Sequence, residues 1–152
     1  MQISWILKPY NELTLDELYA LLRLRSEVFV VEQDCPFLDM DGKDDKCYHV
    51  MGLADTQPSL VAYTRIVPPG VAYPFASIGR VVTAPHARGY GAGRQLMQRS
   101  IDAVISLYGK VPIQIGAQLY LKKFYESFGF VQIGEMYLED GIEHIEMVKR
   151  EY

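Results

Sequence analysis

Glycines gather between residues 88 and 93, where a short apolar segment gives way to an amphipathic stretch. Gly89, Gly91 and Gly93 carry no Cβ, so the backbone there can approach a ligand closely. A helix that begins at this point presents unpaired N–H groups and the positive end of its dipole to the same place. These features are typical of a site that binds an anion, most often a phosphate group.

Two common phosphate-binding patterns do not fit these glycines. A Walker P-loop ends in Gly-Lys-Ser/Thr, whereas Arg94 and Gln95 follow the last glycine. The dinucleotide fingerprint G-x-G-x-x-G needs its third glycine one position later, and no acidic residue stands where the ribose would be held. The stretch 88–93 instead fits R/Q-x-x-G-x-G/A without a gap. A glycine cluster that serves only close packing is the structural alternative.

With this hexapeptide the sequence resembles the GCN5-related N-acetyltransferases (GNAT), whose pyrophosphate loop for acetyl-CoA has that form. A second segment, residues 121–130, is similar to the L/F-Y-E-x-x-G-F box of the family. A third, residues 28–33, resembles the ElaA-type branch of the superfamily. The chain departs from the pattern at Gln118, where family members often carry Asn seven residues before the box tyrosine.

The resemblance implies an α/β (α+β) fold, the GNAT acyl-CoA N-acyltransferase fold. This is a central, mixed, mostly antiparallel twisted sheet flanked by helices, here as one domain over residues 1–152. It also implies acetyl-CoA as co-substrate. The residues then expected to contact acetyl-CoA are Val81, Val82, Thr83, Arg88, Gly89, Tyr90, Gly91, Ala92, Gly93, Gln118, Phe124 and Tyr125. No His/Cys cluster has metal-ligand spacing, so we expect no metal.

Acetyl transfer to an amine needs donors that polarise the thioester carbonyl, a deprotonated amine and a proton for the leaving thiolate. Backbone N–H groups near Val81 and Val82 could polarise the carbonyl if this strand splays as in the family. Tyr125 is the expected proton donor, because a phenol of pKa about 10 is protonated at neutral pH and a thiol has a pKa of about 8.5. A packing role is the alternative. Neither box contains cysteine, so we expect direct attack by the amine.

The general base is less clearly indicated. Glu32 and His49 are the candidates on the expected acceptor side, and imidazole has a suitable pKa. Either could instead be structural or bind the acceptor's ammonium, and a water relay is a further alternative. The acceptor is expected to be a small-molecule or peptide amine, which sequence does not name because such pockets are built from variable loops. A non-catalytic acyl-CoA-binding module and a transferase of longer acyl chains are the competing functions.

The elements that must position these residues follow in the order β-α-β-β-β-α-β-α-β-β. We expect strands near residues 2–8, 48–54 and 60–67, and a first helix that a capping box starts at Thr14 and that runs to about residue 30. After the central strand and the glycine helix come a strand from Val111, a helix over about 118–127, and a hairpin of 130–138 with 142–149 across an Asp-Gly turn.

The composition bounds the class of protein. The 152 residues suffice for one domain with a single substantial core, and 49% apolar with 22% charged residues is ordinary for a soluble globular protein. A net charge of −4 argues against nucleic acid as the main partner and mildly favours a cationic acceptor. The longest apolar run is too short for a membrane span, and the first residues do not read as a signal peptide. We therefore expect a cytoplasmic protein.

Two further segments carry expectations. Cys35 and Cys47 are the only cysteines, and we expect free thiols, with a regulatory disulfide as the alternative. The acidic stretch between them, Asp39 to Asp45, superficially suggests a calcium loop. Lys43 occupies a ligand position, however, and no glutamate stands at the twelfth place, so a solvated loop is expected.

The C-terminal hairpin carries more apolar residues than one buried face needs. We therefore hypothesise a homodimer that covers part of this surface. The residues are Val131, Ile133, Met136, Ile142 and Ile145.

Overall fold

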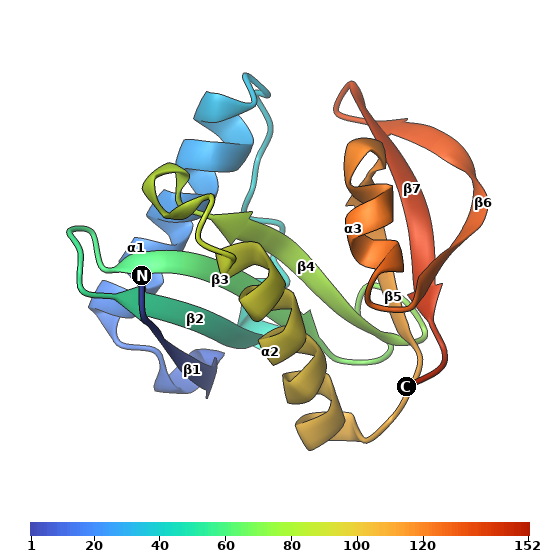
Figure 1. Cartoon of the computed structure of the whole chain (residues 1–152), viewed down its shortest axis with the longest axis horizontal. Helices are drawn as coiled ribbons and strands as arrows, with labels where there is room; N and C mark the ends of the chain where they lie inside the picture. Colours follow the sequence, from blue (N-terminus) through green and yellow to red (C-terminus); the bar gives the residue numbers. More distant parts are fainter.

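The computed structural model describes all of residues 1–152 and contains one seven-stranded sheet in the order β1-β2-β3-β4-β5-β7-β6 (Figure 1). All neighbouring strands are antiparallel except β4 and β5, as predicted for a mixed, mostly antiparallel sheet. The bounds are β1 Ile3–Pro9, α1 Leu15–Arg25, β2 Tyr48–Ala54, β3 Leu60–Val67, β4 Ala76–Thr83, α2 Ala92–Tyr108, β5 Ile113–Gln118, α3 Lys122–Glu126, β6 Phe130–Glu139 and β7 Ile142–Lys149. None of the helices is long and apolar enough to cross a membrane.

The first helix begins where the sequence predicts and changes character before its predicted end. The Glu17 N–H donates to Thr14 Oγ1 at 3.1 Å and the Thr14 N–H donates to Glu17 Oε1 at 2.9 Å, which completes the capping box. Regular α-helix ends at Arg25, and π-helical turns continue over Ser26–Glu32. Such turns are rare and frequently occur at functional sites.

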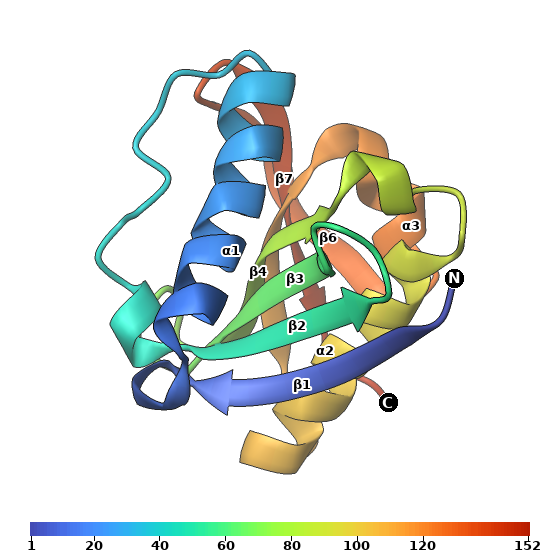
Figure 2. The same ribbon diagram turned by 90° about the vertical axis from the view of Figure 1, so that its left-hand side faces the viewer.

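The apolar residues form two clusters, one on each face of the sheet, where composition suggested a single core. Strand β3 divides them by alternation, since Val61 and Tyr63 pack with α1 while Ala62 and Ile66 pack with α2. Figure 2 shows α1 in front of the strands and α2 behind them. Both helices therefore fix the position of β3 and of its neighbour β4.

Strands β4 and β5 diverge soon after they meet. Their parallel pairing consists only of Ala76 with Ile113 and Ser77 with Gln114. Beyond these residues the sheet splits into a β1–β4 half and a β5–β7 half, seen on either side of Figure 1. The edges of β4 and β5 that face each other therefore lack strand partners over most of their length.

A bulge lies on the other side of β4. The register with β3 shifts between Tyr63 and Arg65, and Arg80 in β4 has φ of 51°. This conformation is unfavourable for a residue with a long side chain. Arg80 is held there because its Nε donates to Asp39 Oδ1 at 2.8 Å and its Nη2 to the Asp39 carbonyl at 2.7 Å.

The acidic stretch is not a solvated loop, and that expectation is corrected. Arg25, which is fully buried, donates to Asp39 Oδ2 and to Asp44 Oδ1, each at 2.8 Å. Arg65 donates to Asp41 Oδ1 at 2.8 Å and to Asp44 Oδ1 at 3.1 Å. Removing one partner of a buried ion pair costs about 3–5 kcal/mol. The network therefore fixes this segment against α1, β3 and β4.

The two cysteines are buried and free, in agreement with the expectation of thiols. Burial raises the pKa of Cys47 to about 11. The Cys35 thiol donates to the Asp140 carbonyl at 3.5 Å, so it connects the fixed acidic segment to the turn between β6 and β7.

Candidate active site

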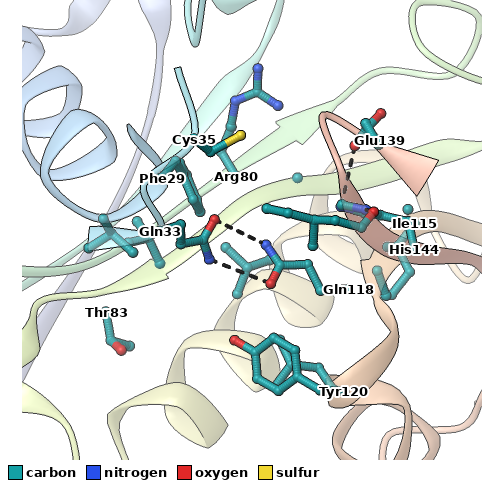
Figure 3. Close-up of a pocket in the computed structure, with 18 of the residues that line it drawn as sticks. Phe29, Gln33, Cys35, Arg80, Thr83, Ile115, Gln118, Tyr120, Glu139 and His144 are labelled. Carbon is teal, nitrogen blue, oxygen red and sulfur yellow. Dashed lines mark hydrogen bonds and ion pairs between the residues drawn. The ribbon is translucent and has the colours of Figure 1, made fainter. Parts of the chain in front are cut away.

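A cavity of about 460 Å³ occupies the split between β4 and β5. Its walls come from the π-helical turns and the segment after them, the second half of β4, the end of β5, α3, and the turn between β6 and β7. Figure 3 shows Thr83 and Tyr120 toward one end of the view, and Cys35, Arg80 and Glu139 toward the other. Segments far apart in the sequence thus share one site.

The structure brings most of the predicted cofactor residues to this cavity. The lining residues among them are Val81, Val82, Thr83, Arg88, Gly93, Gln118, Phe124 and Tyr125. Gly89, Tyr90, Gly91 and Ala92 lie outside the lining; the first three form the turn that leads into α2, and Ala92 is the first residue of the helix. Gly89 and Gly91 have φ of 87° and 75°, and Gly91 is the N-cap of α2.

The glycine turn has free space where side chains would be. A Cβ placed on Gly89, Gly91 or Gly93 would meet no atom within 4 Å. At Gly52, by contrast, a Cβ would come 2.7 Å from the Trp5 ring, as expected of a glycine needed for packing. The packing explanation therefore does not account for the turn, and its exposed backbone at a helix N-terminus is suited to bind an anion.

Arg88 and Glu32 form an ion pair at this end of the cavity. Arg88 Nη1 lies 2.8 Å from Glu32 Oε1, and both side chains are about two-fifths exposed at 43% and 40%. Arg88 Nη2 also donates to the Thr83 carbonyl at 3.3 Å. Glu32, the candidate base, thus lines the cavity, and its carboxylate neutralises Arg88, the side chain expected to bind the diphosphate.

Tyr125 lines the cavity from α3 and is 4% exposed. Its ring packs edge-on against Phe124 and Phe130, with centroids 5.2 and 6.1 Å away. Burial raises the pKa of the Tyr125 hydroxyl well above its ordinary value, with a smaller contribution from Tyr120. The hydroxyl therefore carries its proton at neutral pH, and the ring packs in the core, so the packing role weighed for Tyr125 is present while proton donation stays a prediction.

An amide pair crosses the cavity. Gln118 Nε2 donates to Gln33 Oε1 at 3.3 Å, and Gln33 Nε2 donates back at 3.5 Å (Figure 3). Gln33 ends the π-helical turns and Gln118 ends β5, so the pair joins the two halves of the split sheet. The longer amide at position 118 is what reaches this partner.

His49 does not reach the cavity and is no longer a candidate base. It is fully buried on β2, where Nε2 donates to the Asp44 carbonyl at 3.0 Å and Nδ1 lies 2.7 Å from the Tyr63 hydroxyl. Burial lowers its pKa, although the Asp44 carbonyl opposes the effect. The ring is a neutral structural element that joins the acidic segment to the sheet.

A different histidine lines the cavity, and sequence reasoning missed it. His144 lies on β7, is 7% exposed, and is opposite Gln118 in the register of β5 with β7. Its Nε2 is 3.3 Å from Glu139 Oε2 (Figure 3). The hairpin pattern places His144 on one face with Glu146, but only the pairing with β5 shows that this face borders the cavity.

Comparison with known proteins agrees with this geometry. Residues 44–151 match the model of the acetyltransferase (GNAT) domain, and the chain belongs to the GNAT acetyltransferase family. It is 41% identical to protein ElaA of Escherichia coli over 97% of this chain and 96% of that protein. A UPF0039 protein of Synechocystis is 42% identical over 99% of this chain and 97% of its own.

A solved structure extends the similarity to three dimensions. The crystal structure of an acyl-CoA N-acyltransferase from Pseudomonas aeruginosa is 44% identical, with a TM-score of 0.92 over 97% of this chain and 99% of that one. The predicted family, its ElaA-type branch and the predicted fold are therefore confirmed.

Proposed function

We propose that this protein transfers an acetyl group from acetyl-CoA to the nitrogen of a primary amine by direct attack of the amine. The observation that carries the proposal is the cavity in the split between β4 and β5. It has Arg88 and Gly93, which flank the glycine turn, at one end and Tyr125 in its wall. Membership of the GNAT family supports the same reaction class.

Acetyl-CoA would bind to backbone groups that lack a partner in the fold and to the Arg88 side chain. Amides of the turn 89–93, with Arg88, would hold the diphosphate, and Glu32 would release Arg88 for this purpose. The free edge of β4 would hydrogen-bond the amides of the pantetheine arm as an added strand would. Acetyl-CoA supplies the activated acyl group.

Two groups would serve the chemistry at the thioester. The bulge at Arg80 interrupts the pairing of β4 with β3, and amides near Val81 and Val82 would polarise the carbonyl. Tyr125 would donate its proton to the departing sulfur. Burial raises the pKa of Tyr125, but it also raises the pKa of the departing CoA thiol in the same cavity. The thiolate therefore gains stability when it takes a proton from the phenol.

The acceptor end of the cavity favours a cation. Glu139 and Asp140 line it, and the Arg80 charge is compensated by Asp39. An ammonium group would be attracted here, whereas a carboxylate would be repelled.

Calorimetry and an amine screen test the proposal together. We expect wild-type protein to bind acetyl-CoA and to release free CoA in the presence of at least one primary amine, with the acetylated amine detected by mass spectrometry. Binding without turnover over a broad panel of monoamines, diamines and peptide amines would favour a non-catalytic acyl-CoA sensor. Faster turnover with longer acyl-CoAs would redirect the assignment to long-chain acyl transfer.

A further inference from the structure

An amine acceptor presents a proton problem that Tyr125 does not solve. An aliphatic amine with a pKa of about 10 arrives as ammonium at neutral pH and cannot attack until it loses a proton. The acidic or basic side chains that line the cavity are Glu32, Arg80, Arg88, Tyr120, Tyr125, Glu139, Asp140 and His144, with Cys35 beside them. Of the possible acceptors, Glu32 is held by Arg88 at 2.8 Å.

His144 is fixed in place by three contacts. Its ring stacks on that of Tyr137, with centroids 5.9 Å apart and an interplanar angle of 29°. Its Nδ1 is 2.8 Å from the Ile142 carbonyl oxygen, and its Nε2 is 3.3 Å from Glu139 Oε2. The imidazole plane and the direction of both nitrogens are thereby set before any acceptor arrives.

These contacts determine which nitrogen is basic. A carbonyl oxygen can only accept a hydrogen bond, so the short contact to Ile142 requires a proton on Nδ1. The neutral ring then has its lone pair on Nε2, beside the Glu139 carboxylate. Once Nε2 takes a proton, the ring and the carboxylate form an ion pair. Imidazole is also the side chain that changes charge nearest neutral pH.

The residues that contact or face His144 are acidic or neutral. Glu139 is the last residue of β6, Asp140 belongs to the turn that follows, and Gln118 is opposite His144 in β5. Tyr137 covers the ring and donates its hydroxyl to Glu146 Oε1 at 3.1 Å, where the Tyr73 hydroxyl also donates at 3.2 Å. None of these neighbours is a cation, and Arg80, which lines the same cavity, is paired with Asp39.

We propose that His144 is the general base and that Glu139 positions it, so that the preferred acceptor is an aliphatic primary amine that binds as ammonium beside this pair and contacts both His144 Nε2 and the Glu139 carboxylate. This inference rests on the proposed function. The ammonium gives one proton to Nε2, and the neutral nitrogen attacks the thioester carbonyl carbon. The C–N bond forms, the C–S bond breaks, and the sulfur takes the Tyr125 proton. The acceptor nitrogen loses a second proton, which restores Tyr125, and His144 releases its proton to solvent.

Two acceptors of different basicity test the role of His144. With an aliphatic amine of pKa about 10, His144→Gln should lower kcat/KM by about 10²–10⁴-fold. With an alkoxyamine, which is neutral at the assay pH and needs no base before attack, the same variant should lose less than about tenfold. Glu139→Gln should also lower kcat/KM more with the aliphatic amine than with the alkoxyamine, but by a smaller factor than His144→Gln. His86→Gln, in an exposed turn, and Glu143→Gln, exposed on the same hairpin, are matched controls expected to retain wild-type rates with both acceptors.

Nitrogen NMR of the His144 ring gives a readout that does not depend on turnover. The neutral ring should carry its proton on Nδ1 and none on Nε2, and His144→Gln should bind acetyl-CoA as wild type does. Equal losses with both amines, or a proton on Nε2 of the neutral ring, would overturn the assignment. So would an amine-selective loss in Glu32→Gln but not in His144→Gln. Wild-type protein that binds acetyl-CoA but acylates no amine would refute the proposed function itself, and the His144 step with it.

Discussion

Glycine replacements in α2 separate ligand binding from packing, because the helix has a comparable glycine at each end. Gly91 precedes α2 with φ of 75°, and Gly109 follows it with φ of 84°. A Cβ at either residue, or at Gly93 in the first turn, would meet no atom within 4 Å. Stability changes at 91 and 109 therefore come from backbone strain, and Gly93, which has no positive φ, is free of it.

The expected stability changes follow from these backbone angles. Gly91→Ala should cost about 1–2 kcal/mol, the penalty of a left-handed L-residue. Gly109→Ala should cost about 1–3 kcal/mol, since its extended positive-φ conformation is also unfavourable. In a domain of this length each kcal/mol corresponds to about 2–4 °C in Tm. Gly93→Ala should keep or raise the Tm, because alanine is favoured over glycine within a helix by up to about 1 kcal/mol.

The expected affinities divide the same variants differently. A methyl group at 91 enters the space assigned to the CoA diphosphate, so Gly91→Ala should bind CoA at least tenfold more weakly, a loss of about 1.4 kcal/mol or more. Gly93→Ala should bind CoA nearly as wild type does, because the pattern R/Q-x-x-G-x-G/A accepts alanine at this position. Gly109→Ala should bind CoA as wild type does. Calorimetry with CoA and thermal unfolding of the three variants provide both measurements. A folded Gly91→Ala protein with unchanged CoA affinity would refute the location of the diphosphate site.

Three other predictions concern catalysis, acid stability and assembly. Tyr125→Phe should lower kcat by about 10²–10⁴-fold while acetyl-CoA affinity and Tm stay near wild type, provided chemistry limits the rate; a fall in Tm with little change in kcat would indicate packing alone. Burial opposes ionisation of Asp41, but Arg65 outweighs it and holds the Asp41 pKa well below its ordinary value. This stabilisation is present above pH about 4 and is lost as the pH falls further, so Tm between pH 5 and 2 should drop less in Asp41→Asn than in wild type. Strand β6 exposes four large apolar side chains, Val131, Ile133, Met136 and Leu138, whereas Ile145 is buried. We therefore expect sedimentation to show a dimer that Val131→Lys weakens. A wild-type mass that stays monomeric at all concentrations would contradict this.

Local patterns were sufficient for most of the architecture. The capping box at Thr14, alternation over residues 2–8, and the glycines around α2 each act within a few residues of chain. The first helix was extended to about residue 30 because apolar spacing does not distinguish an α-helix from the π-helical turns of Ser26–Glu32. The glycine turn and Tyr125 were identified because short sequence boxes carry them.

The rest of the site depends on contacts between distant segments. Asp39 looked solvated because its partners Arg25 and Arg80 are 14 and 41 positions away. His49 was wrong as a candidate base, and His144 was overlooked, for a similar reason. Both histidines lie in strands, and which one meets the cavity is decided by the split between β4 and β5 and by the register of β7 with β5, which no local pattern encodes.

The divergence of β4 from β5 also bears on how this protein avoids aggregation. An open sheet has two edges, here β1 and β6, but the split creates two more inside the molecule. Unpaired edges invite strands of other chains. These inner edges face a cavity of about 460 Å³ that is walled by the π-helical turns, α3 and the turn between β6 and β7, and that the Gln33–Gln118 pair crosses. The fold thus places the two unpaired edges inside the molecule, where a slender ligand can use their backbone groups and the surrounding walls separate them from the strands of other chains.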